Sequence, residues 1–170
     1  MPYPNRKPMR LKDYDYSQNG AYFITICTYN RQKLFEISTV GNDLCVVPSC
    51  DVPQNKIIEK WLHELENKFN VTIDKYVVMP DHIHMILIVD LERHVGRSLQ
   101  DMMQWFKTMT TNEYIKSVKE NVLPPFDKKV WQKSYYDHVI RDEDDYITKW
   151  NYIENNPVKR LAENAEIGVL

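Results

Sequence analysis

The order of apolar and polar positions along this 170-residue chain predicts alternating strands and helices. Residues 21–29 are rich in β-branched and aromatic side chains, which is typical of a strand. Apolar residues recur at helical spacing in residues 55–69 and again in residues 98–119. Three further strands are expected at 71–79, at 82–89 and at the end of 130–140, and a last helix is expected from 142 to 156.

Local signals refine the boundaries of these elements. Only Pro80 and Asp81 separate two of the strands, so that pair is expected to be antiparallel. Ser98 followed by Asp101 predicts an N-terminal capping box. Residues 41–54, with two prolines, are interpreted as a loop with a short strand at 44–47. Asn156 and Pro157 are expected to end or kink the last helix.

The resulting order, β-α-β-β-α-β-α, predicts an α+β protein with a ferredoxin-like βαββαβ core. The sheet is expected to be antiparallel with helices on one face, followed by an extra C-terminal helix. The whole chain, 1–170, is interpreted as one domain with a basic N-terminal arm at 1–19 and a short polar tail at 158–170. This fold by itself does not specify a function, because it serves many.

Composition narrows the class of protein. The net charge is −2, so the overall balance does not point to nucleic acid, although local basic groups remain available. Three cysteines without a CxxC pair argue against a disulfide framework. No apolar run is long enough to span a bilayer and no signal peptide is recognisable, so a cytoplasmic location without membrane attachment is expected.

Two histidines begin the strand at 82–89. Successive side chains of a strand point to opposite faces, so His82 and His84 are expected to share one face. Two imidazoles in this arrangement can form half of a metal site. The alternative is that one ring is exposed at the strand end while the other satisfies a structural hydrogen bond.

The last helix carries a second candidate group. On a helical wheel, Tyr146, Ile147, Trp150 and Ile153 form the stripe expected to pack on the sheet. Tyr152 lies off that stripe, on the same flank as Lys149 and Asn156. A surface tyrosine lying along a neighbouring element is the alternative.

The two halves together suggest phosphoryl chemistry. A metal held by His82 and His84 could polarise a phosphoryl oxygen, and the Tyr152 phenol could attack the phosphorus. The phenol needs help to ionise, because its ordinary pKa is about 10. Lys149 is the nearest cation on the helix, and the Asn156 side-chain oxygen is a candidate third ligand.

Several segments resemble a known family. His82-Ile83-His84 is similar to the His-hydrophobic-His motif of HUH-type single-strand nucleases. Three blocks look like IS200-like tyrosine transposases, in particular the REP-associated (RAYT) branch: Met79-Pro80-Asp81-His82-Ile83-His84, Trp131 with Tyr136-Asp137-His138-Val139-Ile140-Arg141, and Tyr152-Ile153 with Asn155-Asn156-Pro157-Val158-Lys159. The N-terminal stretches 10–16 and 20–25 also resemble it, so the likeness covers nearly the whole chain.

The resemblance implies a metal-dependent endonuclease and strand transferase acting on single-stranded DNA near hairpins. It implies His82, His84 and Asn156 as ligands of Mg²⁺ or Mn²⁺, and Tyr152 as the nucleophile that forms a 5′-phosphotyrosine bond. Lys149 is a candidate stabiliser of phosphate charge. The role would be DNA transposition or processing of REP elements, by a monomer or a homodimer. The candidate DNA-binding residues are Arg6, Arg10, Lys12, Arg31, Lys33, Arg141, Lys159 and Arg160.

The sequence also suggests two alternative functions. Ferredoxin-like sheets with exposed aromatic residues can bind single-stranded nucleic acid without cutting it. A replication initiator or relaxase of the same superfamily would carry extra domains or a pair of tyrosines at helical spacing. Tyr136 and Tyr146 are interpreted as packing residues, and Asp137 and His138 as structural hydrogen-bonding groups.

Overall fold

The fold was obtained as a computed structural model, which describes residues 20–39, 46–48, 52–90 and 98–167. The basic arm expected at 1–19 lies outside these residues. Within them, no helix is long and apolar enough to cross a lipid bilayer.

The centre of the molecule is a four-stranded antiparallel sheet in the order β4-β5-β1-β6. The strands are β1 (Gly20–Cys27), β4 (Thr72–Met79), β5 (His82–Val89) and β6 (Tyr136–Ile140). This order and the two helical crossovers confirm the ferredoxin-like expectation. The predicted bounds of β5 agree with the observed ones at both ends.

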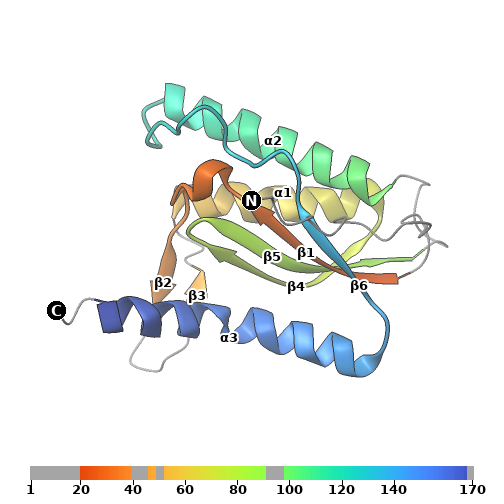
Figure 1. The fold of residues 1–170 in the computed structure, drawn as a ribbon. Coiled ribbons are helices and arrows are strands. Elements are labelled where there is room, and N and C mark those ends of the chain that lie inside the picture. The colour runs from red at the N-terminus through yellow and green to blue at the C-terminus, as the bar shows by residue number, and fades with distance from the viewer. Residues whose placement is uncertain (1–19, 40–45, 49–51, 91–97, 168–170) are drawn as a thin grey trace, which may run out of the picture.

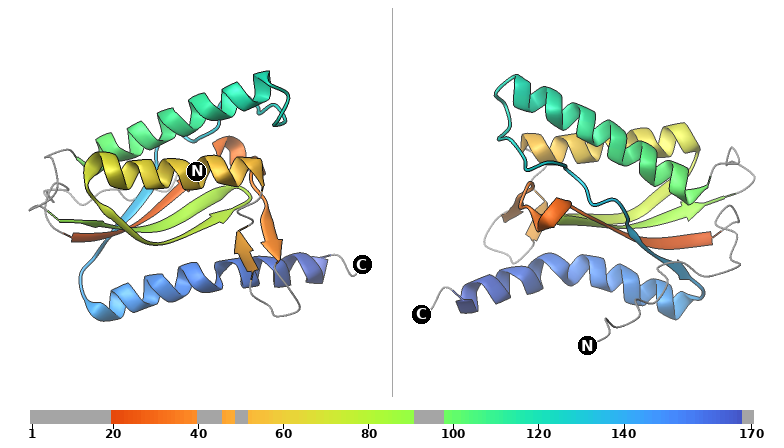
Figure 2. Two further views of the ribbon diagram at one scale, coloured as in Figure 1. Left: turned by 180° about the vertical axis from the view of Figure 1, so that it is seen from behind. Right: turned by 45° about the horizontal axis from the view of Figure 1, so that its top comes forward.

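Three helices cover the two faces of the sheet. Helices α1 (Pro53–Phe69) and α2 (Leu99–Lys119) lie side by side on one face, and α3 (Glu143–Ile167) lies alone across the other (Figures 1 and 2). Side chains that alternate along the strands contribute to two separate apolar clusters, one on each face of the sheet. The larger contains Ile24, Ile83 and Phe106 under α1 and α2, and the smaller contains Phe23 and Ile153 under α3.

Caps explain where the first two helices begin and end. Pro53 opens α1, where its missing N–H costs nothing, and Asn70 ends it in the left-handed region with φ 54°. The Ser98 hydroxyl accepts from the Asp101 backbone N–H, and the Asp101 carboxylate accepts from the Ser98 N–H. The predicted capping box is therefore confirmed.

The structure departs from the sequence-based expectation in three places outside the sheet. A small hairpin, β2 (Ile37–Thr39) with β3 (Val46–Pro48), occupies part of the segment interpreted as a loop, and β2 was not foreseen. Ile147, assigned to the packing stripe, is 48% exposed. Helix α3 does not end at Pro157 but continues to Ile167, so most of the expected tail is helical.

Burial explains why α3 runs through its proline. Pro157 has no N–H to give to the carbonyl of Ile153, which costs a helical hydrogen bond. Ile153 and Pro157 are nevertheless one turn apart and both buried, so the apolar ring of Pro157 packs at a position where a polar side chain would be buried. Packing against the rest of the fold thus offsets the local preference for ending the helix.

Candidate active site on the α3 face of the sheet

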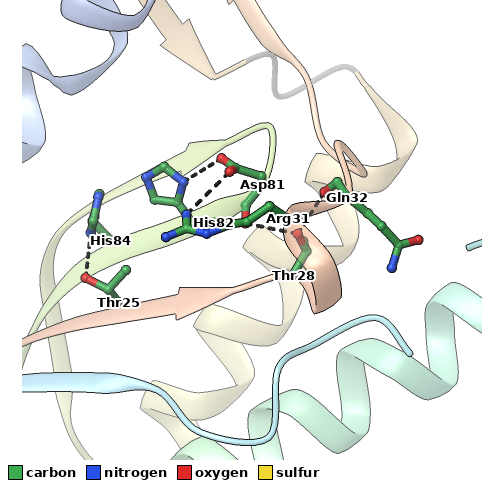
Figure 3. Close-up of polar contacts among 7 residues, drawn as sticks. All are labelled: Thr25, Thr28, Arg31, Gln32, Asp81, His82 and His84. Atoms are coloured by element: carbon green, nitrogen blue, oxygen red, sulfur yellow. Dashed lines mark hydrogen bonds and ion pairs between the residues drawn. The ribbon is translucent and has the colours of Figure 1, made fainter. Parts of the chain in front are cut away.

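The two histidines lie together at the start of β5, on the sheet face that α3 covers (Figure 3). Their ring centroids are 4.5 Å apart with an interplanar angle of 74°. His84 is only 5% exposed, whereas His82 is half-buried nearer the strand end. The period-two spacing therefore brings both imidazoles to one place, as the sequence predicted.

His84 is held neutral by its surroundings. Burial, then the neighbouring His82 and Arg31, lowers the pKa of His84 to about 3. Its Nδ1 is 2.8 Å from the Thr25 hydroxyl oxygen on the adjacent strand, where Thr25 and His84 are direct partners. Its Nε2 is buried and has no hydrogen-bond partner among the described residues. A buried, unpartnered ring nitrogen of a neutral imidazole is suited to accept a metal ion.

His82 is oriented by a carboxylate. Its Nδ1 donates to the Asp81 Oδ1 at 2.7 Å, which leaves the lone pair of the neutral ring on Nε2. The other oxygen of Asp81 is 3.3 Å from Nη1 of Arg31. Carboxylate–histidine pairs of this kind fix the tautomer and raise the basicity of metal-ligating imidazoles.

The turn that carries Asp81 is fixed by the 3₁₀ segment η1 (Tyr29–Arg31) and its neighbours. The buried Thr28 hydroxyl lies within hydrogen-bonding distance of the backbone oxygens of Asp81 (3.0 Å) and Gln32 (2.8 Å), and the Pro80 oxygen accepts from the N–H groups of Leu34 and Phe35. Arg31 itself has φ 56°, a left-handed conformation that disfavours non-glycine residues. This backbone turns Arg31 towards Asp81 (Figure 3).

Helix α3 brings Tyr152 to the histidines. The Tyr152 and His84 rings meet edge to face with centroids 5.2 Å apart, although the two residues are far apart in sequence. Phe23 on β1 supports both, stacking on His84 at 5.4 Å and meeting Tyr152 edge-on at 5.8 Å. Lys149 Nζ lies 5.5 Å from the centroid of the same Phe23 ring. Tyr152 remains 45% exposed, so a large substrate can reach it.

Asn156 follows Tyr152 by one helical turn and is half-buried. No group of three or more His, Cys, Asp or Glu side chains suited to a metal occurs in the described ranges. A metal at this place would therefore need a different third donor besides the two imidazoles. An amide oxygen such as that of Asn156 has the chemistry that Mg²⁺ and Mn²⁺ accept.

The remaining candidates are scattered. Arg31 belongs to the Asp81 pair, and Lys33, Arg141 and Lys159 are exposed. Arg6, Arg10, Lys12 and the Arg160 side chain lie outside the described part of the chain.

Other assignments near the site have mixed outcomes. Tyr136 was interpreted as a packing residue, but it is 47% exposed, because it sits on the edge strand β6 beyond the cover of α3. The structural interpretation of His138 is confirmed by its hydrogen bond to Asp145 at 2.7 Å.

Sequence reasoning did not assign functional roles to Phe23, Thr25 or Asp81. Asp81 could have been suspected, because it precedes His82 directly in a tight turn. Thr25 and Phe23 could not, since their contacts depend on the register of β1 against β5. That register pairs Thr25 with His84 and Phe23 with Ile86, which residue spacing alone does not reveal.

The chain is similar to known proteins in both sequence and fold. Residues 16–156 match the family model described as transposase, IS200 like. The chain belongs to the IS200-like transposase family. The match covers β1, both histidines and the first part of α3, up to Asn156. Membership therefore supports a transposase-type function on DNA and suggests a DNA-cleaving enzyme of the HUH type.

Two relatives of this IS200-like protein match most of its length. A protein of Haemophilus influenzae without an assigned function is 32% identical over 166 residues, covering 91% of this chain and 89% of the relative. A second H. influenzae protein, provisionally named a REP-associated tyrosine transposase, is 23% identical over 155 residues and covers 85% and 74% of the two chains.

Two solved structures share the fold of this family member. One is a REP-associated tyrosine transposase bound to a REP hairpin, with a TM-score of 0.60 and 20% identity over 89% of this chain and 74% of the other. The other is a Deinococcus radiodurans protein provisionally called a transposase, with a TM-score of 0.51 and 16% identity over 86% and 97%. At these identities, the likeness establishes the fold.

Proposed function

We propose that this IS200-like protein cleaves and rejoins single-stranded DNA near hairpins, with Tyr152 as the nucleophile. The observation that carries the proposal is the meeting of Tyr152 and His84 at 5.2 Å within one chain. A tyrosine and a cation from α3 and two histidines from β5 converge on the Phe23 ring of β1 or on its neighbours. Packing alone would not require an exposed phenol beside a buried, unpartnered imidazole nitrogen.

The residues present fit a divalent metal ion. His82 and His84 would supply neutral ring nitrogens, with Asp81 orienting the first and Thr25 the second. Asn156 would add an amide oxygen from α3. When bound, Mg²⁺ or Mn²⁺ would supply Lewis-acid polarisation of a phosphoryl oxygen.

Tyr152 would do the covalent chemistry. Its phenol oxygen forms a bond to the phosphorus, and the bond between that phosphorus and the 3′ oxygen of the preceding nucleotide breaks. The phenol gives up its proton and the leaving oxygen takes one, so the released strand ends in a 3′-hydroxyl. The product is a 5′-phosphotyrosine bond, which the 3′-hydroxyl of the same or another strand can attack in reverse. Lys149, on the same helix flank, would offset negative charge on the phosphate.

The DNA partner proposed is a hairpin with adjoining single strand. A solved protein of the same fold, a REP-associated tyrosine transposase, is bound to a REP hairpin, which supports this choice of substrate. The open side of the Tyr152 ring gives a polymer access that a closed pocket would not.

The test is covalent capture. Labelled hairpin DNA is incubated with the protein and Mn²⁺ or Mg²⁺ and separated on a denaturing gel. We expect a DNA–protein adduct in the wild type that is absent in Tyr152→Phe, because that variant lacks the attacking oxygen. Tyr136→Phe is the matched control, since Tyr136 is equally exposed on the same sheet face. An adduct of undiminished yield in Tyr152→Phe would remove Tyr152 from the proposed role.

A non-catalytic single-strand binder remains the alternative, favoured by one observation. Tyr136 and Tyr152 are both nearly half exposed, and exposed aromatic rings can stack on unpaired bases. A denaturing gel and a native gel, run on the same mixtures, separate the two functions. A binder would shift DNA on a native gel but give no adduct with wild-type protein under any metal condition.

A further inference from the structure

A second feature lies on the opposite side of the sheet from the histidines. A groove of about 970 Å³ runs between α2 and the segment 126–135 that leads into β6. Its volume is near the upper end of ordinary ligand pockets, about 300–1,000 Å³. The groove lies beside α2, whereas Tyr152 belongs to α3. Helices α2 and α3 lie on opposite faces of the sheet (Figure 2).

The charge of this groove differs from that of the whole protein. Lys107, Lys128, Lys129 and Lys133 line it, and no Asp or Glu does. The chain as a whole has 24 acidic and 22 basic residues, so this concentration is local. Lys60, Lys75 and Lys116, which lie outside the groove, form ion pairs with glutamates. The exposed Lys128, Lys129 and Lys133 are thus available to an anionic partner.

The rest of the lining offers what a nucleic acid base needs. Phe126 and Tyr135 are half-buried aromatic residues, and Phe126 is fixed edge-on against Tyr114 at 5.6 Å. Exposed amide side chains, Gln104 and Asn112 among them, project from α2. A basic groove with aromatic platforms and adaptable hydrogen-bonding groups is the arrangement that proteins use for single strands.

The groove is a built structure that is tied to the candidate active site. The Lys107 ammonium donates to the backbone oxygens of Gln132 (2.6 Å) and Lys133 (2.9 Å), holding the outer wall to α2. Gln32 donates to the oxygens of Asp127 and Lys129 and accepts from the Asp127 N–H. The adjacent Arg31 pairs with Asp81, so two neighbouring residues connect the wall to the histidines.

We propose that the groove between α2 and residues 126–135 binds a single-stranded DNA segment outside the catalytic site. This inference rests on the proposed function for the identity of the polymer, but not on any chemistry at Tyr152. The lysines would contact phosphates and the aromatic rings would support unpaired bases. The groove wall and the histidine site are both in contact with the segment 28–32 at one end of the sheet. A strand bound in the groove would therefore be retained near the cleavage site.

The test compares two double variants of the full-length protein. Lys129→Gln with Lys133→Gln removes two groove charges, and Lys116→Gln with Lys119→Gln removes two exposed charges from α2 outside the groove. Binding of a labelled oligothymidylate about 10 nucleotides long is measured by fluorescence anisotropy in EDTA at several salt concentrations. The oligomer forms no hairpin, so hairpin recognition does not contribute.

We expect the groove variant to lose affinity severalfold. The salt slope, which is the steepness with which the logarithm of the binding constant falls with the logarithm of salt concentration, should decrease by about 1.4. This corresponds to roughly 0.7 for each of the two lost phosphate contacts on a single strand. The control variant should keep the wild-type slope. Equal affinity and slope in both variants would overturn the proposal. Polyglutamate should compete poorly because it has no bases, and competition equal to that of oligothymidylate would also overturn it, in favour of an acidic protein partner.

The adduct assay separates this inference from the proposed function. If wild-type protein forms the Tyr152 adduct while both double variants bind oligothymidylate alike, only the groove proposal fails. If no adduct forms but the groove variant alone loses single-strand binding, the groove proposal stands and the catalytic proposal fails. At saturating hairpin DNA the groove variant should reach the wild-type adduct yield, because its substitutions lie across the sheet from Tyr152.

Discussion

At the scale of single residues, Phe23 is the position on which the candidate site depends most. Its ring contacts His84, Tyr152 and Lys149, which come from β5 in the middle of the chain and from the C-terminal helix α3. None of these contacts is a hydrogen bond, so Phe23 acts by shape. It fixes how closely the phenol approaches the histidines.

Phe23→Leu tests this role. We expect adduct formation to slow by about 10- to 100-fold, since small displacements of a reacting group cost up to that much. The unfolding free energy should fall by about 1 kcal/mol. Phe106→Leu is the control, because Phe106 is equally buried in the other cluster and touches no candidate site residue. Equal slowing in both variants, measured from single-turnover gels, would mean that stability and not positioning is responsible.

The neutrality of His84 is a second testable property at this scale. Its folded pKa of about 3 lies below the ordinary value of 6.5, so the unfolded chain binds the extra proton first. Stability from this group is therefore complete above pH 6.5 and is lost as pH falls towards 3. In EDTA, the His84 ring signals in an NMR titration should stay unchanged from pH 7 to about pH 4. A His84 midpoint near 6 would contradict this description of the site.

At the scale of elements, α3 is held to the sheet as much by polar contacts as by apolar burial. His138 on β6 bonds to Asp145 in the first turn of α3, and Tyr146 donates to Asp74 on β4. Lys75 on β4 pairs with Glu154 and lies over the Trp150 ring. Of the apolar stripe predicted for this helix, only Ile153 is fully buried. These polar contacts along the sides of α3 therefore help to hold the helix that carries Tyr152 in position.

Breaking the His138–Asp145 contact should loosen the start of α3. Burial raises the pKa of Asp145, but the hydrogen bond from His138, the Arg141 N–H and the charge of Lys149 together lower it below its ordinary value. The stabilising effect of the carboxylate is therefore present above the ordinary Asp pKa and is lost as pH falls. Asp145→Asn should lower the unfolding free energy at neutral pH by about 1 kcal/mol in urea titrations. Glu143→Gln removes the same charge from the same turn, and no hydrogen bond or ion pair joins Glu143 to the described part of the sheet. A matching loss in that control would attribute the effect to the helix dipole.

These elements also show what the sequence could and could not reveal. The capping box at Ser98 and the limits of β5 were predictable because they depend on neighbouring residues. The exposure of Ile147 and the helix beyond Pro157 were not, because they depend on where the sheet ends beneath α3. The hairpin of β2 with β3 was only half found, since one short strand has no periodicity to detect.

At the scale of the whole molecule, the candidate site joins the two ends of the described chain across the sheet. The histidines were paired correctly from strand alternation, and the tyrosine was placed correctly off the stripe of its helix. Whether the two meet was beyond the sequence, because it depends on which face of the sheet α3 covers. Helix α3 lies on the opposite face of the sheet from α1 and α2 (Figure 1). On that face, the Tyr152 ring meets the His84 ring of the same chain.

That placement makes a prediction about how many chains one active site needs. If Tyr152 serves the histidines of its own chain, a mixture of Tyr152→Phe and His84→Ala proteins contains no intact site. If α3 is exchanged between two chains, the same mixture contains sites with the tyrosine of one protein and both histidines of the other. The geometry favours the first case, so the mixture should give no more adduct than either variant alone. The gel assay for this needs equal concentrations and pre-incubation long enough for any subunits to exchange. Recovery of about a quarter or more of the wild-type yield would be expected for a freely exchanging homodimer with shared sites, and would show that the helix leaves its own sheet when the protein acts on DNA.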